Sequence, residues 1–182
     1  SGGGSMSGRH AEIDRALDDR ARRSRARLTT PGREQRRTIE ALVAGRSLLV
    51  VAPQGWGAAL CWQVAAAVRG GPVLVIASSA RDLARRAQAL AHDAGLVACA
   101  LDGDRPPAVT AALAAQIVAG HYDVVFLSAR QLGDPQVYAA ARACRPWLVV
   151  VEDADRLSTH ALRHDPSLAR AAALLAELRD PA

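Results

Sequence analysis

The chain has 182 residues, 50% hydrophobic and only 3% aromatic, enough for one domain with a core of alanine and aliphatic side chains. The formal net charge is +5 and every basic residue is arginine, which suits phosphate contacts, although we favour a GC-rich genome as the cause. No apolar run could span a membrane, we find no signal peptide, and the three cysteines lack metal-ligand spacing. These features exclude a membrane or disulfide-rich protein, and we expect a cytoplasmic one.

The chain opens on a linker-like stretch and a charged helix. Residues 1–5 read Ser-Gly-Gly-Gly-Ser and look like an artificial linker, so we expect the native sequence to begin at Met6. Residues 6–30 are predicted to hold a charged N-terminal helix, and residues 31–182 a single domain. The helix carries a cluster of arginines that suits either nucleic acid or a solvated face paired with Asp18 and Asp19: Arg20, Arg22, Arg23, Arg25 and Arg27.

From residue 34 onward, helical patterns alternate with apolar runs of strand length. The helices are expected at residues 34–45, from the glycine turn to about 69, and at 80–95, 108–120, 135–144 and 167–178. The strands are expected at residues 47–52, 72–77, 96–101, 123–128 and 147–152. Five apolar strands alternating with helices predict an α/β fold whose mostly parallel sheet has helices on both faces. Ligands of such sheets bind at the carboxyl ends of the strands.

A glycine turn follows the first predicted strand. The sequence Gln54-Gly55-Trp56-Gly57 runs into a helix that begins near Ala58 and Ala59. A working phosphate loop needs a lysine for the phosphates and a hydroxyl for magnesium, at the two positions that these alanines occupy. Such a turn could bind an anion weakly, or could need glycine for its geometry alone; we give the two readings similar weight.

Two adjacent carboxylates, Glu152 and Asp153, end the fifth predicted strand. Acidic residues at this place can hold magnesium and polarise water in nucleotide-driven motors. Taken alone, an acidic turn is more commonly just solvated. Together with the glycine turn after the first strand, the pair becomes a more specific signal.

Several motifs occur in the order and spacing of one family. They are Gln35 ahead of the first domain helix, the glycine turn followed by Leu60-Cys61-Trp62-Gln63, Ser128 to Leu132 ("SARQL"), Glu152-Asp153-Ala154-Asp155 and Arg156-Leu157-Ser158. The sequence between about Thr30 and Leu178 resembles the first motor domain of RecQ-type DNA helicases of superfamily 2, especially the actinobacterial form. The resemblance implies a RecA-like P-loop NTPase fold.

The departures from that family fall on its chemistry. The family's lysine and Ser/Thr are Ala58 and Ala59, its magnesium-binding Asp is Glu152, its water-polarising Glu is Asp153, and its coupling His is Asp155. Its aromatic-rich coupling loop is matched by residues 159–168, which contain no aromatic residue. We therefore expect Glu152, Asp153 and Asp155 to be catalytic remnants. No catalysis, metal or cofactor is expected, although ATP, ADP or another anion could bind weakly at the Gly55–Gly57 turn. The resemblance implies this vestigial nucleotide site: Gln35, Gln54, Gly55, Trp56, Gly57, Ala58 and Ala59.

The resemblance also bears on partners. The family's next strand, which lies beside the phosphate-loop strand, and its second motor domain are not found in this sequence. We therefore expect an open sheet edge near Ser47–Ala52 that a protein partner, a second copy or the N-terminal segment covers. Arg81 and Arg130 match the family's DNA-contacting regions, whereas Arg85 and Arg86 are expected on a solvated helix face.

Three functions stay open at this point. The first is a catalytically degenerate RecQ-like motor domain that binds DNA or protein without hydrolysing ATP. The second is an ATP-dependent helicase subunit or fragment that needs a second motor domain and a cation supplied in trans. The third is a pure protein-interaction module.

Overall fold

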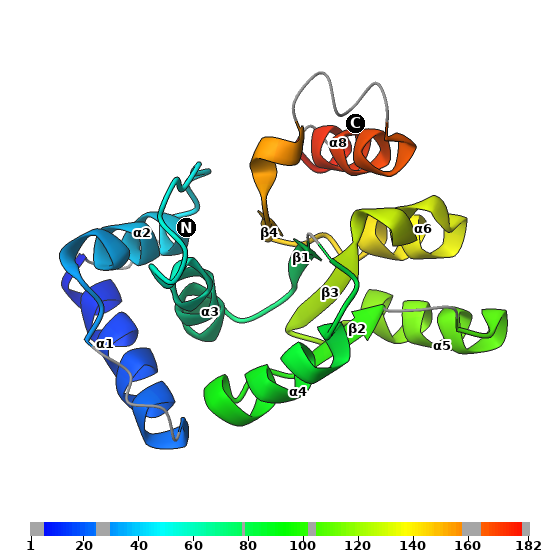
Figure 1. The fold of residues 1–182 in the computed structure, drawn as a ribbon. Helices are drawn as coiled ribbons and strands as arrows, with labels where there is room; N and C mark the ends of the chain where they lie inside the picture. Colours follow the sequence, from blue (N-terminus) through cyan, green and yellow to red (C-terminus); the bar gives the residue numbers. More distant parts are fainter. Residues whose placement is uncertain (1–5, 25–29, 78, 102–104, 158–164, 180–182) are drawn as a thin grey trace. The chain divides into compact units, whose positions relative to one another are not determined.

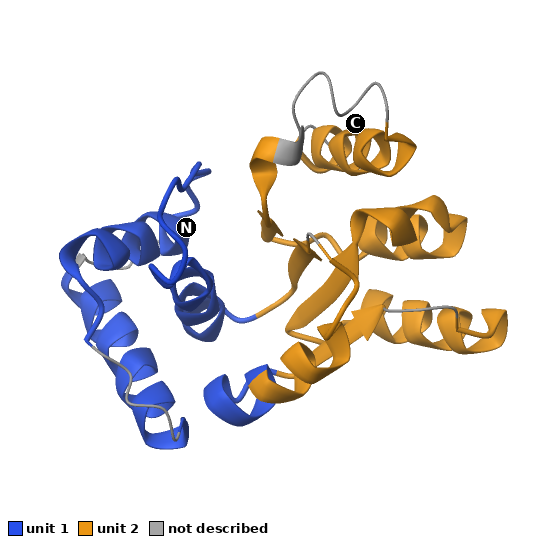
Figure 2. Cartoon of the chain, in the orientation of Figure 1, with its two compact units in different colours: residues 1–70, 90–96 blue, residues 71–89, 97–182 orange. Residues whose placement is uncertain are grey.

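The computed structural model of the chain describes residues 6–24, 30–77, 79–101, 105–157 and 165–179 (Figure 1). The linker-like residues 1–5 lie outside these ranges. The chain forms two compact units, which Figure 2 distinguishes by colour. Unit 1 comprises residues 1–70 and 90–96, and unit 2 comprises residues 71–89 and 97–182. The predicted division into a helix at 6–30 and a domain at 31–182 stays a prediction.

Unit 1 contains three mutually contacting helices, α1 (Met6–Arg23), α2 (Arg33–Val43) and α3 (Ala58–Arg69). Their apolar faces supply the buried side chains, among which Ile13 and Ile39 are fully enclosed. The α2 helix ends at Val43, two residues before the predicted end at Gly45, and Gly45 adopts a φ of +79°, which glycine takes at little cost. Its N–H donates to the carbonyl of Leu42 over 2.8 Å, and this bond closes the last turn.

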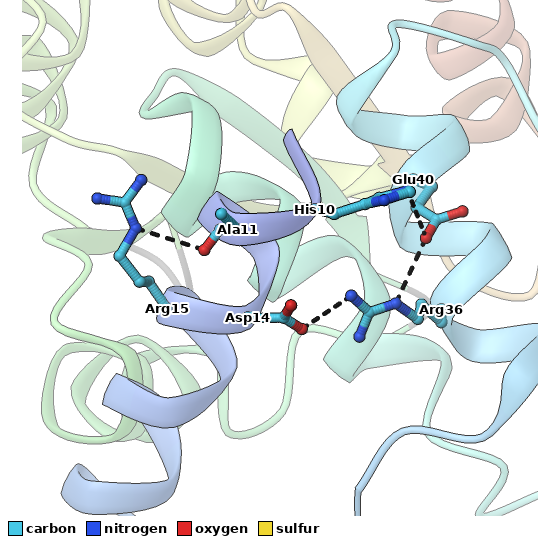
Figure 3. A network of polar contacts seen from close by, with 6 residues as sticks. All are labelled: His10, Ala11, Asp14, Arg15, Arg36 and Glu40. Atoms are coloured by element: carbon cyan, nitrogen blue, oxygen red, sulfur yellow. Dashed lines mark hydrogen bonds and ion pairs between the residues drawn. The ribbon is translucent and has the colours of Figure 1, made fainter. Parts of the chain in front are cut away.

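Polar contacts also join α1 to α2 (Figure 3). The Arg36 guanidinium donates to Asp14 over 2.8 Å and lies 3.4 Å from Glu40. A ring nitrogen of His10 lies 3.3 Å from the same Glu40 carboxylate. Since these side chains are partly exposed, the network orients the two helices, and the apolar contacts beneath it supply most of the stability.

Unit 2 contains a sheet of four parallel strands, which confirms the predicted α/β class. The strands are β1 (Val73–Ala77), β2 (Ala98–Leu101), β3 (Val124–Ser128) and β4 (Leu148–Val151), in the order β2-β3-β1-β4. In the register, Val75 of β1 lies between Phe126 of β3 and Val150 of β4. Every residue of β1 and β3 is buried, as expected of central strands in a parallel sheet.

Helices and short turns connect these strands. They are α4 (Leu83–Ala94), α5 (Pro107–Val118), the 3₁₀ turn η1 (Ala129–Gly133), α6 (Pro135–Ala143), the 3₁₀ turn η2 (Ala154–Leu157) and α8 (Pro166–Arg179). Proline stands at the first position of α5, α6 and α8, where its missing N–H costs nothing. The sheet face that carries Leu74, Ile76, Val125 and Leu127 packs with residues of α5, α6, η1 and α8 into one core.

The strand predicted at Ser47–Ala52 is wrong. These residues adopt no regular secondary structure and belong to unit 1, so the sheet of the described ranges has four strands instead of five. The expected open edge along this segment is therefore not a sheet edge. The local sequence is apolar enough for a strand, but a strand also needs a neighbour to satisfy its backbone groups.

None of the helices in the ranges that the structure describes combines the length and the apolar composition needed to cross a membrane.

Candidate functional site

The predicted site residues are divided between the two units. The glycine turn and Gln35 belong to unit 1, whereas Arg81, Arg130 and the carboxylates after β4 belong to unit 2. Each group has its own local geometry.

The glycine turn leads directly into α3. Gly55 and Gly57 have φ values of +83° and +90°, and Gly57 is the N-cap of the helix. The Trp56 N–H donates to the carbonyl of Pro53 over 3.1 Å and tightens the turn. Ala58 and Ala59 form the exposed first turn of α3, so methyl groups stand where a lysine and a hydroxyl would be needed.

Gln35 is engaged within the protein through both ends of its side-chain amide. Its carbonyl oxygen accepts the Gly32 N–H over 2.7 Å, which caps α2. Its amide NH₂ donates to the carbonyl of Trp56 in the glycine turn. The amide thus joins the start of α2 to the glycine turn.

Gly57 is held close to that amide. A Cβ added at this position would lie 2.7 Å from the Gln35 side-chain nitrogen, inside any real Cβ contact. At Gly55 a Cβ would meet nothing within 4 Å. The backbone conformation favours glycine at both positions, and a Cβ at Gly57 would in addition displace the end of the Gln35 side chain.

At the carboxyl end of β4, the Glu152 carboxylate is bound by Arg86 of α4. Both guanidinium NH groups donate to it, one of them over 3.1 Å and the other more closely. The Arg86 guanidinium carbon also lies 4.9 Å from the ring centroid of Phe126 on β3. The two charged side chains are 29% and 25% exposed, so the pair is largely withdrawn from solvent.

The prediction of a solvated face was wrong for Arg86. Its neighbour Arg85 does extend into solvent, where it lies 3.4 Å from Asp82. Arg86 instead turns toward the sheet, because α4 follows β1 and β1 is hydrogen-bonded to β4. The sequence pattern of α4 does not give the strand order, so it could not predict that Arg86 pairs with Glu152.

Asp153 and Asp155 lie beyond this pair. Asp153 has a φ of +50°, a left-handed conformation that aspartate tolerates better than most residues. Asp155 lies in the first turn of η2, and both side chains are exposed. Within the part of the chain that the structure describes, no three His, Cys, Asp or Glu residues gather as a metal site.

A cavity of about 290 Å³ opens at the carboxyl ends of β1, β3 and β4. Its polar lining includes Ser128, Arg130, Glu152, Asp153 and Asp165. The Ser128 N–H and hydroxyl both donate to the side-chain oxygen of Gln131, over 2.6 and 2.8 Å. The cavity lies at the carboxyl ends of the strands, where α/β sheets commonly hold ligands.

The predicted nucleic-acid residues are both exposed in unit 2. Arg130 lines the cavity, and the Arg81 N–H donates to the Ser79 hydroxyl over 3.1 Å. On α1, Arg22 and Arg23 pair with Asp19, and the bond from Arg23 holds the pKa of that carboxyl below its ordinary value.

Some predicted features lie outside the described residues. They are Arg25 and Arg27 of the arginine cluster, Ser158, and residues 159–164 of the loop matched to the family's coupling loop.

These residues do not fit a magnesium-bound nucleotide. The turn offers methyl groups where a phosphate cation and a metal hydroxyl are needed, and Glu152 already has a cation. No protein-family model matches the chain, and no curated protein matches it.

Proposed function

We propose that the chain is a RecQ-like motor domain of RecA-like fold that has lost ATP hydrolysis and acts in the cytoplasm as a DNA-associated or protein-binding scaffold. The observation that carries the proposal is the Arg86–Glu152 ion pair. In the resembled family the residue at the position of Glu152 binds magnesium. Here the guanidinium of Arg86 binds the Glu152 carboxylate instead. Ala58 and Ala59 support the same conclusion at the glycine turn.

Titration calorimetry with ATP and magnesium tests the loss of nucleotide chemistry. We expect no micromolar binding to the natural chain and no ATPase activity with single-stranded DNA. The matched variant restores the two missing groups, as Ala58→Lys with Ala59→Thr, and should gain measurable binding if the turn keeps its phosphate-loop geometry. Tight, magnesium-dependent binding by the natural chain would overturn the proposal.

DNA association is tested through the two exposed arginines of unit 2. Arg130 has no ion pair among the described residues, and its guanidinium could neutralise a phosphate. Fluorescence titration with single- and double-stranded oligonucleotides at two salt concentrations should show salt-sensitive binding. Each of Arg81→Gln and Arg130→Gln should lower the logarithmic salt slope by about 1. Arg85→Gln is the control, since Arg85 pairs with Asp82.

A pure protein-interaction module is favoured by one specific observation. Four consecutive large apolar residues, Leu48 to Val51, are exposed. This alternative predicts no DNA binding even at low salt. An active helicase subunit would instead require a cation in trans, and unwinding after mixing with a separate second motor domain would support it.

A further inference from the structure

A second cavity, of about 410 Å³, is lined only by residues of unit 1 (Figure 2). Residues of α1, of α3 and of the stretch 94–96 form its walls. Its volume is typical of a site for a small molecule. The apolar part of the lining consists of Ala16, Val64, Ala67, Val68, Ala94 and Leu96.

Arg20 of α1 brings an uncompensated charge to this cavity. Its Nε and Nη1 atoms are buried and have no hydrogen-bond partner among the described residues. A guanidinium stays charged at any pH that a folded protein tolerates, so burial without a partner costs free energy. Burial lowers the pKa of Arg20, and the Asp93 carboxylate opposes that shift without forming an ion pair with it. A negative charge is thus missing beside Arg20.

The acidic residue next to it in sequence, Asp19, is engaged elsewhere. The Nε of Arg23 donates to one oxygen of Asp19 over 2.7 Å, and Arg22 lies 3.6 Å from the other. Arg23 in turn lies against Gly95, where an added Cβ would be 3.1 Å from the guanidinium carbon. Asp19 could therefore pair with Arg20 only by giving up its bond to Arg23.

We propose that this cavity binds a small organic carboxylate with an apolar body, of the class of medium-chain fatty acids, and that the ligand carboxylate pairs with Arg20. Carboxylate and guanidinium form strong, charge-assisted hydrogen bonds, and the apolar lining accepts the chain. Since Nε and Nη1 are shielded by protein, Nη2 is the nitrogen that meets the ligand.

The charges around the cavity favour a ligand with a single negative charge. Two carboxylates and two guanidinium groups balance one another in the lining: Glu12, Asp19, Arg15 and Arg20. A phosphate dianion would meet the two carboxylates with twice the charge of a carboxylate ligand. The inference goes beyond the proposed scaffold function and does not depend on nucleotide or DNA binding.

Titration calorimetry with three probes separates the two parts of the ligand. Octanoate carries both the charge and the apolar chain, octan-1-ol the chain alone, and acetate the charge alone. Octanoate should bind at least about tenfold more tightly than octan-1-ol, because the alcohol lacks the charge-assisted hydrogen bond. Acetate should bind about 100-fold more weakly than octanoate, since it has no chain to bury. Inorganic phosphate should bind no better than acetate.

Variants test whether Arg20 recognises the carboxylate. Arg20→Gln should abolish the preference for octanoate and leave octan-1-ol binding unchanged. Its stability in urea should not fall, because it removes a buried charge that has no partner. The matched control is Arg22→Gln on the same helix, whose side chain is 70% exposed, and it should keep the preference. Asp93→Asn removes the competing carboxylate and should strengthen octanoate binding.

Four results would overturn the proposal. They are the absence of octanoate binding, equal affinities for octanoate and octan-1-ol, phosphate binding as tight as that of octanoate, and an Arg20→Gln variant that keeps the preference. Each of these would leave the ATP and DNA measurements of the proposed function unaffected, so the two proposals fail separately.

Discussion

At the glycine turn of unit 1, the positions that would handle phosphate charge and metal are alanines, and a neighbouring amide, that of Gln35, is tied into the turn. At the carboxyl end of β4 in unit 2, the carboxylate of Glu152 is still present, and Arg86 binds it. The glycine turn has no side chain that could bind phosphate or metal, whereas the carboxyl end of β4 has a carboxylate whose charge Arg86 neutralises. The sequence alone reveals the two alanines of the first region, but it does not reveal the ion pair of the second.

The largest expected effect comes from Arg86→Ala. Removing the guanidinium leaves a largely buried Glu152 carboxylate unpaired, and should lower the free energy of unfolding by about 1–3 kcal/mol. Urea denaturation measures the change. Arg85→Ala, one position away and exposed, should cost less than about 0.5 kcal/mol. Adding Glu152→Gln to Arg86→Ala should recover part of the loss; equal losses in both arginine variants would show that the pair contributes nothing.

The glycine turn should respond next, through Gly57→Ala. Its left-handed backbone and its approach to Gln35 both oppose a Cβ, so we expect a loss of about 1–3 kcal/mol. Gly55→Ala has the same kind of backbone but open space around it, and should lose about 1 kcal/mol. The difference between the two, by chemical denaturation, isolates the contact with Gln35. Indistinguishable losses would mean that Gln35 moves aside without cost.

The cysteines report on each unit separately. Burial raises the pKa of the Cys61 thiol to about 11 and that of Cys99 to about 12. A higher pKa leaves less thiolate at neutral pH, so Cys61 should be alkylated about 100-fold more slowly than a thiol at the ordinary value. Gln35→Ala should accelerate labelling of Cys61 in unit 1 and leave Cys99 in unit 2 unchanged, as read by mass spectrometry. Acceleration of both thiols would show that the effect of the substitution is not confined to unit 1.

The smallest effect should come from the exposed ion pair between α1 and α2. Asp14→Asn removes the charge that faces Arg36, and should cost at most about 0.5 kcal/mol in low salt. In high salt the difference from the natural chain should disappear, because the pair is screened by ions. Thermal unfolding at two salt concentrations measures it. A loss that persists in high salt would indicate a structural role beyond charge.

Most helices and strands were predicted from the sequence, but one predicted strand, at Ser47–Ala52, is not formed. The strands at β1 to β4 were predicted within two residues because each is a continuous apolar run bounded by turn residues. The run at Ser47–Ala52 has the same composition and is not a strand. Composition reports that a segment suits a sheet, but hydrogen-bonding partners decide whether it joins one.

The sequence by itself determined the α/β class, the parallel sheet, the glycine turn before α3 and the alanines at its end, because these follow from local periodicity and residue chemistry. Only the tertiary structure decided that Arg86 binds Glu152, that Gln35 is hydrogen-bonded to the glycine turn, and that Leu49 and Val51 are exposed. Each of these depends on which distant residues the strand order and helix packing bring together, and one-dimensional patterns do not encode that proximity.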